Sequence, residues 1–140
     1  MRIIYTHKPN SLISFFIRLF IFSRWSHCAI ELSNGTILDT TMRTGVRVTS
    51  KEDFLKEYPD QTIIEVFLFY ESIAETFALT QVGKPYDWTA LVSLVLQRDW
   101  QEPDSWFCSE LVEATLSNGG AKRFRDEVNR ITPQQSWSVL

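Results

Sequence analysis

The chain has 140 residues, and its 44% hydrophobic and 14% aromatic content can build one domain over 1–140 and excludes a largely disordered chain. Fourteen Lys and Arg against seventeen Asp and Glu give a net charge of −3, which argues against a nucleic-acid partner because such proteins carry basic surfaces. The two cysteines, Cys28 and Cys108, exclude a disulfide scaffold, and a four-ligand zinc site would need both of them together with His7 and His27.

An apolar run extends from Leu12 to Phe22 near the N-terminus. Arg18 interrupts the run, no small-residue cleavage site follows it, and it is shorter than the roughly 20 residues of a membrane-spanning helix. We therefore predict neither an export signal nor a membrane span, and a cytoplasmic location. The run predicts a helix from Ser11 to Phe22 that is buried in the core; the alternative is a surface that touches a membrane or an acyl chain.

Five short runs have the composition and alternation of β-strands. Ser33-Asn34-Gly35 lies between the second and third runs and predicts a hairpin. The fifth run is long enough to form a central strand. The runs are Arg2–Tyr5, Trp25–Leu32, Thr36–Thr41, Gly45–Thr49 and Thr62–Phe69.

Four further segments have helical spacing or helix-capping residues. Ser50 can cap the first, Gly83 follows the end of the second, and Asp104 or Ser105 can cap the last. The segments are Lys51–Glu57, Ser72–Val82, Trp88–Gln97 and Trp106–Leu116. This order of elements predicts an α+β domain with an antiparallel sheet.

Cys108 lies in the first turn of the last predicted helix. The positive end of the helix dipole and the unpaired backbone N–H groups there favour the thiolate, which is the nucleophilic form of cysteine. The competing interpretation is a small buried side chain without a chemical role.

His27 is the histidine that best complements Cys108, because a base and a nucleophile are the minimum for covalent catalysis. Strand alternation places His27 and Glu31 on one face and Cys28 on the other, so Cys28 is assigned to the core, away from His27. Glu31 lies about 13 Å along the strand from His27, too far to orient the imidazole directly.

Asp39 can reach His27 in one of two hairpin registers. A two-residue turn pairs Ile30 with Asp39 and turns the carboxylate to the wrong face. A three-residue loop with Gly35 in the left-handed conformation pairs Ala29 with Asp39, and His27 and Asp39 then become diagonal neighbours about 7–8 Å apart. We predict the three-residue loop.

Tyr86 lies in a turn, Gly83-Lys84-Pro85-Tyr86-Asp87, that precedes a predicted helix. A turn between two helices is sufficient to explain the glycine, which ends one helix, and the proline, which helps to start the next. The functional alternative is that Tyr86 reaches the site and donates its hydroxyl to a developing oxyanion.

Taken in order, five segments resemble the circularly permuted branch of the papain-like NlpC superfamily, which includes YiiX/YebB-like peptidases and, more remotely, lecithin retinol acyltransferase-like proteins. The similarity covers most of the chain. The segments are Ser26-His27-Cys28-Ala29-Ile30, the hairpin from Asn34-Gly35 to Leu38-Asp39, Gly83-Lys84-Pro85-Tyr86-Asp87, Phe107-Cys108-Ser109-Glu110-Leu111-Val112 and Ile131-Thr132-Pro133.

The resemblance implies a permuted papain-like fold in which an antiparallel sheet packs against the helix that bears the nucleophile. It implies Cys108 as nucleophile, His27 as base, Asp39 as the residue that orients the base, and Tyr86 as a contributor to the oxyanion site. The expected reaction is cleavage of an amide bond through an acyl-enzyme, on peptides of the peptidoglycan type, by a bacterial or phage protein that needs no metal or organic cofactor.

Other functions stay open at this point. A lipid amidase, thioesterase or acyltransferase would use the apolar segment Leu12–Phe22 beside its groove. A non-catalytic binding module or phage structural protein would keep the fold with an unreactive Cys108. A zinc site is disfavoured because Cys28 points away from His27 and no Cys-x-x-Cys spacing occurs.

Overall fold

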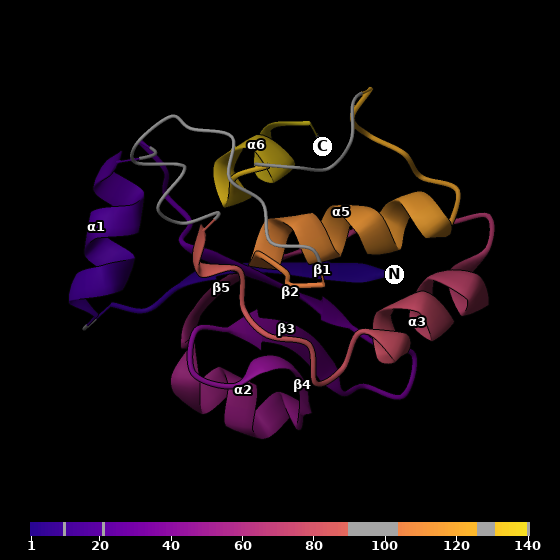
Figure 1. Ribbon diagram of the computed structural model, residues 1–140, viewed down its shortest axis with the longest axis horizontal. Helices are drawn as coiled ribbons and strands as arrows, with labels where there is room; N and C mark the ends of the chain where they lie inside the picture. Colours follow the sequence, from indigo (N-terminus) through magenta and orange to yellow (C-terminus); the bar gives the residue numbers. More distant parts are fainter. Residues whose placement is uncertain (10, 21, 90–103, 126–130, 140) are drawn as a thin grey trace.

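The computed structural model describes residues 1–9, 11–20, 22–89, 104–125 and 131–139 (Figure 1). Within them, five strands form one antiparallel sheet in the order β4-β3-β2-β1-β5. The strands are β1 (Arg2–His7), β2 (His27–Glu31), β3 (Ile37–Thr41), β4 (Gly45–Thr49) and β5 (Asp60–Glu65). The helices are α1 (Leu12–Phe20), α2 (Lys51–Glu57), α3 (Glu71–Thr80), α5 (Cys108–Asn118) and α6 (Pro133–Ser138). The predicted mixed class and antiparallel sheet are confirmed; most of the helix predicted for Trp88–Gln97 lies outside the described residues.

Strand alternation divides the core between the two faces of the sheet. One face packs against α5 and α3, and the other packs against α2 (Figure 1). Ile3, Cys28 and Ile30 belong to the α5 face, whereas Ile4 and Ala29 belong to the α2 face. Adjacent residues of one strand therefore face different helices, as period-two geometry requires.

Helix α5 begins two residues later than predicted, at Cys108, with Phe107 in the N-cap position. The prediction that Asp104 or Ser105 caps it is wrong. Trp106 cannot start the helix because its N–H donates to the Pro85 carbonyl at 3.1 Å in a bridge between the two segments. Every residue from Cys108 to Leu116 is buried, so α5 is the central helix of the layer that packs on this side of the sheet.

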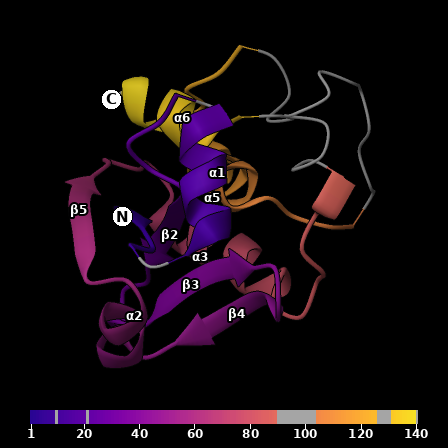
Figure 2. The same ribbon diagram turned by 90° about the vertical axis from the view of Figure 1, so that its left-hand side faces the viewer.

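The prediction that the apolar N-terminal helix is a core helix is wrong. Side chains of α1 are exposed, with Leu12 at 77% and Phe15 and Leu19 each at 52% of full accessibility. The helix stands at one end of the sheet, in front of α5 in the view of Figure 2. Because α5, α3 and α2 already cover both faces of the sheet, α1 makes only a narrow contact, in which the hydroxyls of Ser14 and Ser26 lie 2.7 Å apart.

The predicted central strand Thr62–Phe69 is also corrected. β5 ends at Glu65 and lies at the edge of the sheet beside β1. The apolar residues beyond its end, Phe67 and Phe69, lie in an exposed loop, so the length of the run does not reflect a buried strand. No helix among the described residues is both long and apolar enough to cross a membrane.

Candidate active site

The β2–β3 hairpin has the predicted register. Ile30 pairs with Leu38, and the ladder places Asp39 diagonal to His27 on the α2 face. Gly35 supplies the left-handed residue of the loop, with φ of +81°. As a result, Nε2 of His27 lies 3.0 Å from Oδ2 of Asp39.

Asp39 is a buried carboxylate held between two donors. Arg47, opposite it on β4, donates from Nε to Oδ1 at 2.8 Å and from Nη2 to Oδ2 at 3.3 Å. Burial opposes ionisation of Asp39, but the hydrogen bonds from His27 and Arg47 outweigh burial and hold its pKa below the ordinary value. Because an ionised carboxylate can only accept, it keeps a proton on Nε2 of His27 and leaves Nδ1 for another partner.

The imidazole of His27 is also held from its flat side. Tyr58, which follows α2, stacks on it with ring centroids 4.8 Å apart and planes 16° apart. Phe54 of α2 packs in turn against Tyr58, with centroids 4.9 Å apart. The ring orientation of His27 is thus set by an acceptor at its edge and an aromatic platform on its face.

Cys108 is the first residue of α5, is 3% exposed, lines the same pocket as His27 and packs in the same core cluster as Cys28. Burial opposes ionisation, but the hydrogen bonds from Cys28 and His27 and the charge of His27 lower the pKa of Cys108 well below its ordinary value. Burial likewise opposes the charge of His27, yet Tyr58, Asp39 and Cys108 together raise its pKa well above the ordinary value. The pair therefore favours the thiolate–imidazolium form.

Cys28 is buried in the core as predicted, at 1% exposure. It packs in the same core cluster as Cys108, on the face of β2 that α5 covers. It therefore lies close to Cys108, although strand alternation places it on the face of β2 opposite to His27. Burial and the nearby charge of Cys108 raise the pKa of Cys28, which therefore stays a thiol and can donate a hydrogen bond.

Tyr86 is buried beside the N-terminal end of α5. The bridge between Tyr86 and Trp106 joins its segment to the residues that lead into the helix. Burial, followed by the negative charges of Cys108 and Glu110, raises the pKa of Tyr86 well above its ordinary value. Tyr86 therefore keeps its hydroxyl proton and is available as a hydrogen-bond donor.

A pocket of about 600 Å³ is lined by His27, Tyr86 and Cys108. Ser14 of α1 and Ser11, which precedes the helix, form part of one wall, and residues 41–44, from the end of β3 to the start of β4, form another. A volume of this size is ordinary for a site that binds a small molecule or a few residues of a peptide.

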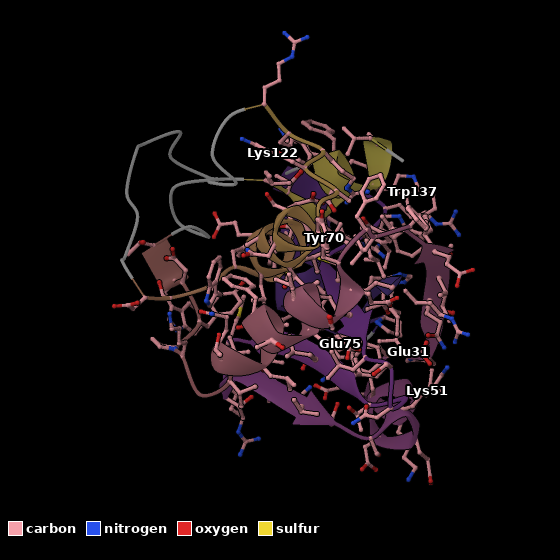
Figure 3. All side chains as sticks on the ribbon, turned by 90° about the vertical axis from the view of Figure 1, so that its right-hand side faces the viewer. Glu31, Lys51, Tyr70, Glu75, Lys122 and Trp137 are labelled. Carbon is pink, nitrogen blue, oxygen red and sulfur yellow. The ribbon has the colours of Figure 1, made fainter. Side chains whose placement is uncertain are left out.

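Other candidate residues lie elsewhere. Glu31 accepts from Lys51 at 2.8 Å and from Arg2 at 3.2 Å at the far end of β2 from His27, and Figure 3 shows Glu31 and Lys51 close together. His7 lies 3.7 Å from Asp60. In the part of the chain that the structure describes, no three His, Cys, Asp or Glu side chains are grouped as metal ligands.

A family model for permuted papain-like amidase enzymes of the YaeF/YiiX type, peptidase family C92, matches residues 2–133. The chain belongs to this family. A search of curated proteins found no match. Membership establishes a permuted papain-like fold and a cysteine hydrolase in general terms, and it agrees with the resemblance derived from the sequence segments.

Sequence reasoning missed three residues that surround His27 and Asp39 in this C92 family member: Arg47, Glu57 and Tyr58. The strand that contains Arg47 was predicted correctly. The feature that could have indicated Arg47 is a charged residue between Val46 and Val48, directly opposite Asp39 on the neighbouring strand. Glu57 of α2 accepts from Arg47 at 2.8 Å. No local pattern indicated Tyr58, because its contact with His27 depends on how α2 packs on the sheet.

Proposed function

We propose that this chain is a cysteine amidase or peptidase in which Cys108 is the nucleophile, His27 the general base and acid, and Asp39 the residue that orients the imidazole. The observation that carries the proposal is the position of His27, whose Nε2 lies 3.0 Å from Asp39 Oδ2 and which lines the same pocket as Cys108. A nucleophile, a base and an orienting acid in hydrogen-bonded sequence make up the catalytic arrangement of cysteine hydrolases.

The proposed reaction proceeds through an acyl-enzyme. The Cys108 thiolate attacks the carbonyl carbon of the scissile amide, and His27 gives its proton to the leaving amine. The Tyr86 hydroxyl and the backbone N–H groups at the start of α5 are placed to donate to the developing oxyanion. His27, now neutral, takes a proton from water, which attacks the thioester and releases the acid.

The pocket lining supports a polar peptide as substrate. Hydroxyl side chains and three basic residues contribute to it, and such groups can accept and donate to peptide amides and carboxylates. The hydroxyl residues are Ser11, Ser14, Ser26, Thr40, Thr41 and Thr44, and the basic residues are Lys8, Arg43 and Arg47. We therefore favour peptides of the peptidoglycan type over a purely apolar substrate.

A lipid amidase, thioesterase or acyltransferase is the second candidate, and the exposure of α1 favours it. The helix that contributes Ser14 to the pocket wall carries exposed Leu12 and Phe15. An acyl chain could then leave the pocket along an apolar surface. A non-catalytic module of the same fold is the third candidate, and it requires that the arrangement of Cys108 and His27 serve no reaction.

The test compares purified wild-type protein with Cys108→Ala and His27→Gln on two substrates, soluble peptidoglycan peptides and an N-acyl amide. We expect release of a new amine from the peptides, lost by about a thousandfold or more in either variant. Faster release from the N-acyl amide would move the assignment to the second candidate. Absence of turnover on both, together with alkylation of Cys108 by iodoacetamide no faster than that of an ordinary thiol, would support the non-catalytic module.

A further inference from the structure

The outer face of α1 carries a stripe of exposed apolar side chains, which we call the α1 stripe: Leu12, Phe15 and Leu19. Their spacing of three and four residues places them along one side of the helix. They are 77%, 52% and 52% exposed, respectively, and Phe22, after the end of α1, is 92% exposed. The opposite side of the helix carries Ser14 and Ile17, which line the pocket. The helix therefore turns an apolar face to solvent.

The segment around the stripe is basic although the whole chain is acidic. No Asp or Glu occurs before Glu31, whereas Lys8, Arg18 and Arg24 fall between residues 8 and 25. The other eleven basic residues and all seventeen acidic residues lie outside this segment. The segment therefore has a charge of +3, whereas the rest of the chain has a charge of −6. Neither Arg18 nor Arg24 forms an ion pair with any residue that the structure describes.

Both arginines are close to the stripe in the chain: Arg18 precedes Leu19 in the last turn of α1, and Arg24 follows Phe22 by two residues. The Arg24 guanidinium lies 4.7 Å from the centroid of Trp25. Burial, followed by the charge of Arg18 and then that of Arg24, lowers the pKa of His7. An apolar stripe flanked by unpaired cations is the composition by which short helices bind at the surface of an anionic bilayer.

We propose that the α1 stripe docks this protein on the surface of an anionic phospholipid bilayer, with Arg18 and Arg24 facing the lipid headgroups. The stripe enters the boundary between headgroups and acyl chains, and the cations remain at the headgroup level. Since the other side of α1 lines the pocket, docking holds the pocket beside the lipid surface. The docking does not depend on the proposed catalytic chemistry.

A second exposed apolar patch gives a matched control. Phe67, Phe69 and Tyr70 are 77%, 72% and 59% exposed in the loop that leads into α3. Figure 3 views this side, which is opposite to α1, and shows Tyr70 and Glu75 on it. Glu65, Glu71 and Glu75 flank the patch, so an anionic surface repels it although its apolar exposure is comparable.

The experiment measures co-sedimentation of the full chain with vesicles, using Cys108→Ala so that turnover cannot alter the lipid. We expect binding to phosphatidylcholine vesicles that contain about a quarter phosphatidylglycerol, weaker binding without the anionic lipid, and weaker binding at high salt. Phe15→Ser/Leu19→Ser should weaken binding at least about tenfold, because each side chain loses apolar burial. Arg18→Ser/Arg24→Ser should remove most of the preference for anionic lipid, and Phe67→Ser/Phe69→Ser should change binding by less than about twofold.

Three results would overturn the proposal. The first is equal binding to vesicles with and without phosphatidylglycerol. The second is unchanged binding of the Phe15→Ser/Leu19→Ser variant, with circular dichroism showing that it is folded. The third is light scattering, without vesicles, that shows a dimer which the same variant abolishes, because the stripe would then be covered by a second copy of the chain.

Discussion

Arg47 lies opposite Asp39 in the β3–β4 ladder and donates to both oxygens of its carboxylate, at 2.8 and 3.3 Å. The same carboxylate holds Nε2 of His27 at 3.0 Å. Arg47 is bound on its other side by Glu57, at 2.8 Å. The carboxylate that contacts the imidazole is therefore itself held in place by a cation, and we expect Arg47 to act on the proposed site through Asp39.

Arg47→Met should lower kcat/KM by about tenfold to a hundredfold, less than the loss of His27, because Asp39 stays present but loses its anchor. Without Arg47 the pKa of Asp39 rises, and the acid limb of the pH–rate profile should shift to higher pH. Glu57→Gln is the matched control. It removes the charge of the carboxylate that binds Arg47 on the side away from Asp39, and it should lower kcat/KM by less than about threefold. An unchanged pH profile in Arg47→Met would show that Arg47 has only a structural role.

The alkylation of Cys108 should follow a pH curve set by its lowered pKa. The thiolate is present above that pKa and is lost as pH falls through it, so iodoacetamide should react rapidly well below the ordinary titration range of a thiol. Cys28 packs in the same core cluster as Cys108 and keeps its proton, so it can donate to the Cys108 sulfur, and its removal in Cys28→Ala should move the midpoint to higher pH. Mass spectrometry of Cys108→Ala identifies which thiol reacts. A midpoint that stays constant in Cys28→Ala would show that Cys28 does not stabilise the thiolate.

Alanine substitutions at Gly45 and Gly35 distinguish the effect of backbone strain from that of a steric clash. Both have positive φ, +68° and +81°, but a Cβ on Gly45 would lie 2.2 Å from the Lys84 carbonyl oxygen, whereas one on Gly35 meets nothing within 4 Å. Gly35→Ala should cost about 1 kcal/mol of unfolding free energy from strain alone. Gly45→Ala should cost more and also lower turnover, because the displaced segment leads into Tyr86.

Urea unfolding and steady-state turnover on the same preparations measure the two effects. Equal stability losses in the two variants, with turnover unchanged in Gly45→Ala, would show that the approach of β4 to Lys84 does not position Tyr86.

Glu113 holds α5, α6 and the segment after α5 together. It is 2% exposed and accepts from Arg123, and from the Ser136 hydroxyl at 2.5 Å. Glu113→Gln should lower the free energy of unfolding by about 3 kcal/mol, because it leaves the Arg123 guanidinium buried without its counter-charge. The double variant Glu113→Met/Arg123→Met should recover most of the loss. Alkylation of Cys108 in the folded protein should not change, and a change would place Glu113 in the site.

Local pattern predicted the features of this fold that are themselves local. Alternation in β2 and the glycine of the loop together predicted how His27 and Asp39 meet, because hairpin geometry depends on a few adjacent residues. Helical spacing and nearby candidate capping residues placed Cys108 in the first turn of a helix for the same reason. The N-cap residue of this helix was predicted wrongly because Trp106 pairs with a segment that is distant in the chain.

The position of α1 could not be predicted from its sequence. An apolar helix is buried only if a face of the sheet is free to receive it, and α5, α3 and α2 occupy both faces. The contacts of Tyr58 with His27, and of Cys28 with Cys108, likewise depend on how helices pack on the sheet. Such contacts join residues far apart in the chain, for which hydrophobic periodicity carries no information.

The loop Ser33-Asn34-Gly35 also bears on how relatives of this protein should be interpreted. A relative that closed the same loop as a two-residue turn, with Ser33 paired to Thr36, would shift the pairing by one residue and point its acid into the opposite layer of the core. It would retain every residue of the proposed triad in an alignment and still lack the contact between the acid and the histidine. The hairpin register, which an alignment of the proposed catalytic residues does not reveal, is therefore a feature to compare among relatives.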